Sequence, residues 1–144
     1  MAMPAGKLEA DYWEIYALIF ESDDILVLGD PGFFLSDADT ASIEQAIHAV
    51  LPFRDRSRLY AEILLAEDGE TIEERYAYIY YDVGGERILQ YDNRSHHPEI
   101  STHPHHMHKG PIPIAGEKDS AWPTDIEFVC FETVLERIRE RFFS

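Results

Sequence analysis

Apolar residues recur at helical intervals near the start of the chain. Between Leu8 and Phe20 they occupy one helix face, at positions Leu8, Tyr12, Ile15 and Ile19. This spacing predicts a helix that follows a loose tail, residues 1–7. Two short apolar runs come next, and the turn signal between them predicts a pair of short strands at Ile25 to Leu28 and Phe33 to Leu35.

Two further segments carry a helical pattern. A helix is predicted from Asp39 or Thr40 to Leu51, with an apolar stripe formed by Ile43, Ile47 and Val50. The last helix is predicted to begin at Thr124 or Asp125. Its apolar positions are Ile126, Val129, Val134, Leu135, Ile138 and Phe142.

The middle of the chain alternates in a way typical of strands. Leu59 to Ala66 and Thr71 to Tyr81 place apolar or aromatic residues at every second position, and Asp68-Gly69 between them is a hairpin signal. After a second turn at Gly84-Gly85, Arg87 to Tyr91 predicts a third strand. The tyrosine-rich second strand is interpreted as a half-buried sheet face.

These elements together predict an α+β fold, an antiparallel β-meander of four to six strands with helices packed on one face. A chain of 144 residues that is 45 % hydrophobic can bury a core, and we expect residues 1–144 to form a single domain. No stretch is long enough to span a bilayer, and no secretion signal is evident. We therefore expect a cytoplasmic protein that has no membrane partner.

The charge balance is strongly acidic. The formal net charge is −16, from 28 acidic and 12 basic residues, which disfavours nonspecific binding to phosphate backbones. Between residues 92 and 109 the charges of Asp92, Arg94, Glu99 and Lys109 cancel, so this segment is a neutral island on an acidic body. Cys130 is the only cysteine, which excludes an internal disulfide and a thiolate metal cage within one chain.

The neutral island contains six of the seven histidines: His96, His97, His103, His105, His106 and His108. Histidine titrates near neutral pH and is the commonest metal ligand, so this run is the best candidate for chemistry. Prolines at positions 98, 104, 111 and 113 predict an ordered loop at the sheet's end or across its open face. Because alternate side chains of an extended segment face opposite sides, only two or three of the rings are expected to meet.

Three interpretations of the run remain open. In the first, His105, His106, His108 and Glu99 bind a divalent transition metal. In the second, a neutral and a protonated histidine act as base and acid on RNA, while Arg94 or Lys109 stabilises the charge on phosphorus. In the third, the histidines only hydrogen-bond to the main chain and to nearby carboxylates, and thereby define the fold.

The same run resembles the signature of the TumE-type toxin family, a pattern close to YDN-x-x-HHPE-x-x-T-x-PHH-x-H. The matching segments are Tyr91-Asp92-Asn93, His96-His97-Pro98-Glu99, Thr102-His103-Pro104-His105-His106 and His108. The resemblance also covers the two predicted strands between Arg75 and Asn93. The chain departs from the family at Ile79, where members often carry histidine, and at His103, where an aromatic residue is commoner.

The resemblance implies the toxin component of a prokaryotic type II toxin–antitoxin pair, neutralised by a helix-turn-helix antitoxin. By analogy with other small toxins, RNA is the expected substrate and the protein a ribonuclease. The expected working groups are His96, His97, His105, His106 and His108, with Asp92 and Glu99 as orienting carboxylates. The alternative from another class is a non-catalytic metal-binding or protein-interaction domain.

Overall fold

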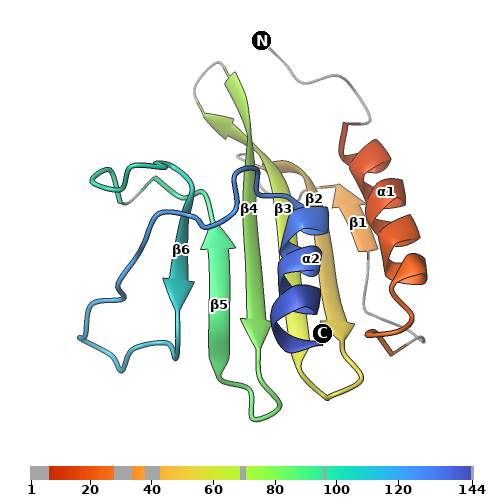
Figure 1. Cartoon of the computed structure of the whole chain (residues 1–144). Helices are drawn as coiled ribbons and strands as arrows, with labels where there is room; N and C mark the ends of the chain where they lie inside the picture. Colours follow the sequence, from red (N-terminus) through yellow and green to blue (C-terminus); the bar gives the residue numbers. More distant parts are fainter. Residues whose placement is uncertain (1–6, 28–33, 38–42, 69–70, 96, 144) are drawn as a thin grey trace.

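In the part of the chain that the structure describes, the fold is a six-stranded antiparallel sheet with two helices on one face (Figure 1). The computed structural model describes residues 7–27, 34–37, 43–68, 71–95 and 97–143. The elements are α1 (Lys7–Glu21), β1 (Phe34–Asp37), β2 (Ile43–Pro52), β3 (Arg58–Asp68), β4 (Thr71–Tyr81), β5 (Arg87–Asp92), β6 (His106–Lys109) and α2 (Phe131–Phe142). Each strand pairs with the next along the chain, which confirms the predicted α+β meander.

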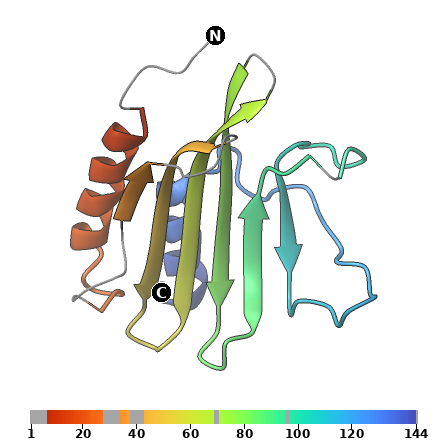
Figure 2. The ribbon, with the colours of Figure 1, turned by 180° about the vertical axis from the view of Figure 1, so that it is seen from behind.

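Both helices pack against the same face of the sheet. α2 lies over the central strands, where Phe131 contacts Tyr78 and Phe142 contacts Tyr80, with ring centroids 6.5 and 5.0 Å apart. Ile15 and Ile19 of α1 belong to the same buried cluster. Figure 2, the view from behind, shows no described helix on the opposite face, which is termed the open face below. No helix within the described ranges is long and apolar enough to cross a membrane.

The alternation of β3 and β4 explains why they form the centre of the sheet. Leu59, Ala61 and Ile63 are at most 4 % exposed and lie opposite Tyr80, Tyr78 and Tyr76 of β4. These tyrosines are at most 7 % exposed, so the tyrosine-rich face is more deeply buried than predicted, because α2 covers it. Side chains at the intervening positions face the open side.

The segment predicted as a helix from Asp39 or Thr40 to Leu51 is strand β2 wherever the structure describes it. Leu51 is fully buried, whereas its neighbour Val50 is 43 % exposed, which is the two-residue alternation of a strand. The helical interpretation was wrong because a sparse apolar pattern fits both periods, and pairing along the whole of β3 decides between them. Asp39 and Thr40 lie outside the described residues.

Other boundaries also differ from the prediction. α2 begins at Phe131 rather than at Thr124 or Asp125, after a turn in which Ile126 is buried without being helical. The histidine run is not entirely a loop, because residues 106–109 form β6 against β5. Of the described residues in the predicted strand 25–28, only Leu26 pairs, as a single bridge to Phe53; Leu28 and the following turn lie outside the described residues.

The burial of β2 leads to a stability test with two neighbouring substitutions. Leu51→Ala should lower the free energy of unfolding by about 2–5 kcal/mol, because it opens a cavity in the core. Val50→Ala, on the open face, should cost less than about 1 kcal/mol. Urea denaturation of both variants measures the difference. The reverse order of the two costs would support the helical stripe through Val50 instead.

Candidate functional site

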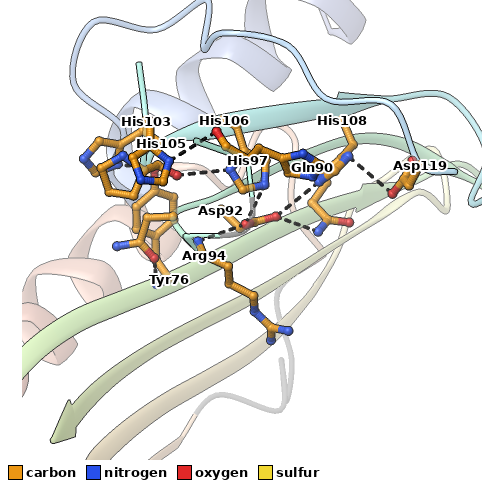
Figure 3. A network of polar contacts seen from close by, with 12 residues as sticks. Tyr76, Gln90, Asp92, Arg94, His97, His103, His105, His106, His108 and Asp119 are labelled. Carbon is orange, nitrogen blue, oxygen red and sulfur yellow. Dashed lines mark hydrogen bonds and ion pairs between the residues drawn. The ribbon is translucent and has the colours of Figure 1, made fainter. Parts of the chain in front are cut away.

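The register between β5 and β6 brings the candidate residues together on the open face. Asp92 lies opposite His106 and Gln90 opposite His108, and Met107 between the two histidines points into the core. His97 returns over them from the preceding loop, with its ring centroid 4.9 Å from His106 and 5.8 Å from His108. His97, His106, His108 and Asp92 are termed the histidine centre (Figure 3).

The Nδ1 atom of each ring in the centre faces an acceptor. His106 Nδ1 lies 3.0 Å from the carbonyl oxygen of Pro104, and His108 Nδ1 lies 2.8 Å from that of Ser120. His97 Nδ1 lies 3.3 Å from a carboxylate oxygen of Glu99. A carbonyl only accepts, so Nδ1 of His106 and His108 carries the proton and Nε2 is the nitrogen turned toward the centre.

Asp92 is a buried carboxylate at the base of the centre, 1 % exposed. One of its oxygens lies 2.9 Å from His106 Nε2 and the other 3.6 Å from His108 Nε2. Gln90 donates a hydrogen bond of 2.9 Å to it. Burial acts to raise the pKa of Asp92, but hydrogen bonds from His108 and Gln90 outweigh it and hold the pKa at about 2. Burial acts to lower the pKa of His108, yet the contact with Asp92 leaves that pKa raised.

Arg87 and Asp119 support the centre from one side. The buried Arg87 guanidinium donates to both carboxylate oxygens of Asp119, at 2.9 and 2.8 Å, and to Gln90 Oε1 at 3.0 Å. These hydrogen bonds are the main reason that the pKa of Asp119 is lowered. A bulge in β5, where Ile88 has no partner on β4, turns Arg87 toward Gln90. The sequence analysis missed Arg87, Gln90 and Asp119.

The remaining sequence candidates lie apart from the centre or at its rim. The ring of His105 stacks on Tyr76, and its Nδ1 lies 2.8 Å from the tyrosine hydroxyl. The exposed Glu99 contacts the centre only through His97. His103 supports the loop through the carbonyl of His97, at 3.2 Å. His96 lies outside the described residues.

The centre borders a groove of about 600 Å³ on the open face. Arg94 and Lys118 supply its basic side chains, and Ile79 forms part of its wall. Lys109, the other basic candidate from the sequence, lies instead 5.1 Å above the ring of Trp122. A second groove, of about 820 Å³, shares Arg94 with the first and is lined by His103 and His105. Arg94 is therefore the basic side chain that the two grooves share.

Within the described residues, the histidines that could hold a metal ion are His97, His106 and His108. This set shares two members with the sequence candidates and replaces His105 and Glu99 by His97. The choice between these residues follows from the register of β6 and the return of the loop, neither of which the histidine spacing specifies.

The family model of Toxin TumE matches residues 20–142, a range that contains every described strand, α2 and the histidine centre. No curated protein and no solved structure matches this chain.

The low pKa of Asp92 predicts a specific acid sensitivity of the metal-free protein. Because its folded pKa of about 2 lies below the ordinary aspartate value of 3.8 in an unfolded chain, its stabilising effect is complete above about pH 4 and disappears as the pH falls through 2. The loss should be about 2 kcal/mol. Asp92→Asn cannot titrate, so its stability deficit relative to wild type should shrink over this window. Urea unfolding at pH 5, 3 and 2 with a chelator measures the change; a constant deficit contradicts the prediction.

Proposed function

Because the chain belongs to the TumE toxin family, whose model matches residues 20–142, we propose that it is a toxin that cleaves RNA at the histidine centre. The observation that supports this function is the convergence of three imidazoles and a carboxylate beside a groove on the open face. Such a set can move protons at neutral pH or bind the ion that activates an oxygen nucleophile.

RNA cleavage requires two proton transfers and an exchange of bonds at phosphorus. The ribose 2′-hydroxyl loses a proton as its oxygen bonds to phosphorus, the bond to the 5′-oxygen breaks, and that oxygen gains a proton. The products are a 2′,3′-cyclic phosphate and a 5′-hydroxyl. The histidine centre is assigned the first proton transfer, and the Arg94 guanidinium is assigned the charge that develops on the phosphoryl oxygens.

Burial limits how the members of the centre act. The side chains of His106 and His108 are 1 and 4 % exposed, so they offer little surface to a substrate, although His108 lines the groove. His97 is 12 % exposed and lines the groove, so it is the ring that lies nearest to bound RNA. His106 and His108 therefore act through His97 or through a group that all three rings hold.

The partner that we assign to this toxin is a protein antitoxin with a basic helix-turn-helix domain, and its assigned docking surface is the outer face of α1. Trp13, Tyr16 and Phe20 form an aromatic row along this face, with neighbouring ring centroids 5.8 and 4.8 Å apart. Trp13 and Phe20 are 59 and 56 % exposed. Exposed aromatic clusters of this kind are typical of protein interfaces.

Charge complementarity supports the choice of partner. The exposed acidic residues Glu14 and Glu21 flank the aromatic row, and the chain as a whole has a net charge of −16. A DNA-binding antitoxin carries a basic surface, which such an acidic body attracts. The aromatic row lies on α1, at the opposite end of the sheet from β6 and the histidine centre (Figure 1), so variants of one should leave the other intact.

Induced expression of the wild-type chain in bacteria should arrest growth, and the purified protein should cleave single-stranded RNA. His97→Ala should restore growth and lower the cleavage rate by about 100-fold or more. His105→Ala is the matched control, because its ring stacks on Tyr76 outside the centre, and it should remain toxic. Circular dichroism checks that each variant folds. Normal growth of cells that accumulate soluble wild-type protein would contradict the toxin assignment.

Trp13→Ala and Phe20→Ala should each weaken antitoxin binding by about 10-fold or more, because they remove exposed aromatic anchors. Both variants should remain toxic, and co-expressed antitoxin should rescue growth less well than it does with wild type. Val83→Ala, an equally exposed apolar residue in the β4–β5 turn, is the control. Calorimetric titration with the antitoxin measures the affinities; equal affinities for all three variants would place the interface elsewhere.

A further inference from the structure

We propose that the histidine centre is a binding site for one zinc-type divalent metal ion, held by Nε2 of His97, His106 and His108 and faced by the Asp92 carboxylate. One ligand nitrogen of each histidine lies within 4.8 Å of those of the other two. The three rings come from β6 and from the loop before it, and they meet beside the open-face groove (Figure 3).

The hydrogen bonds around the rings already have the arrangement of a metal site. Metal-binding histidines commonly donate Nδ1–H to a carbonyl or carboxylate, which fixes the tautomer and leaves the Nε2 lone pair for the ion. His106 and His108 face the carbonyl oxygens of Pro104 and Ser120 in this way. His97 has Glu99 in the corresponding place, at 3.3 Å.

The other nitrogen of each buried ring meets an acceptor as well. Nε2 of His106 and of His108 lie 2.9 and 3.6 Å from the two oxygens of Asp92. A neutral imidazole has one N–H and cannot donate from both nitrogens. Without an added cation, each ring could donate to Asp92 only by taking up a second proton, and the two ring centroids are 5.0 Å apart. A metal ion between the Nε2 atoms and the carboxylate satisfies both rings in their neutral form.

The distances suit an ion of this size. Ligand atoms bound to zinc at about 2.0–2.1 Å in a tetrahedron lie about 3.3 Å from one another. The two Asp92–histidine distances, 2.9 and 3.6 Å, lie on either side of this value. His97 belongs to a loop rather than to the sheet, so its ring can move inward with little cost to the fold.

The contacts of the neighbouring charged side chains also favour a bound cation. The Arg87 guanidinium donates its hydrogen bonds to Asp119 and to the Gln90 amide oxygen, so it does not neutralise Asp92 directly. Asp92 is a buried carboxylate whose contacts are with the two histidines, the Gln90 amide and the main chain of Arg94. A divalent ion would add positive charge at the point where the three imidazoles and the carboxylate meet.

The role of the ion in cleavage rests on the proposed function, whereas its binding does not. With Asp92 as the fourth ligand, a role in catalysis requires a fifth position on the groove side, and catalytic zinc sites can expand to five ligands. An ion held there lowers the pKa of a hydroxyl or water bound to it and thereby activates the attacking oxygen. The buried rings of His106 and His108 would then take part in catalysis without touching RNA.

Metal-stripped protein should bind one Co²⁺ per chain, with visible absorption bands of four- or five-coordinate cobalt that Zn²⁺ abolishes. His97→Ala and His106→Ala should each lower the Co²⁺ affinity by more than about 100-fold. His105→Ala should bind like wild type, because its ring lies on Tyr76. His97 is the more exposed of the two ligands, so its variant decides the question if His106→Ala fails to fold.

The proposal is overturned if the wild-type chain takes up no stoichiometric Co²⁺, or if His105→Ala loses as much affinity as His97→Ala. RNA cleavage by stripped and by zinc-reloaded protein separates it from the proposed function. Cleavage that survives stripping removes the ion from catalysis and leaves the ribonuclease intact. A loaded protein that cleaves no RNA keeps the metal site and contradicts the ribonuclease.

Discussion

The buried carboxylate of Asp92 is the interaction on which the site and its surroundings depend. An ionised group that is 1 % exposed must be compensated by nearby donors, because an unpaired buried charge is strongly destabilising. His106, His108 and Gln90 supply this compensation, and Gln90 is in turn fixed by Arg87. The charge of Asp92 on β5 thus orients His106 and His108 on β6 and, through Gln90, the side chain of Arg87.

Strand β6 serves the core and the site through alternate residues. Met107 is 1 % exposed within the core, and the histidines on either side of it face the opposite way. Its outer edge is closed by a pair of hydrogen bonds of 2.9 Å to the main chain of Trp122. Because the side-chain period of a strand is two, Met107 cannot be buried without placing His106 and His108 together on the open face. Packing of Met107 into the core therefore positions the two histidines of the candidate site.

Local sequence patterns predicted most of the strands, whereas long-range contacts determine which residues come together at the site. The alternation of β3 and β4 is readable because each strand carries its own period, but β2 needed its partner to distinguish a strand from a helix. The sequence identified Asp92 and the histidines as candidates. It could not identify Arg87 and Asp119 as part of the site. The two residues are 32 positions apart in the sequence, and Arg87 is placed by a bulge that no sequence motif marks. Ile79, where the resembling family often has histidine, lines the same groove, so that position belongs to the site's surroundings.

The acidic charge of the chain would act differently on RNA and on the cationic partners that we propose. A net charge of −16 repels a polyanion and attracts cations, so RNA can approach only where local positive charge offsets the field. Arg94 and Lys118 line the groove together with Glu62, Asp92 and Asp119, so a divalent ion in the histidine centre would supply positive charge that these side chains alone do not. The same field would concentrate the ion at its site and draw in a basic antitoxin. An acidic body is thus compatible with an RNA-directed toxin if cations mediate the contact, and the bound ion would then contribute to RNA binding as well as to the reaction.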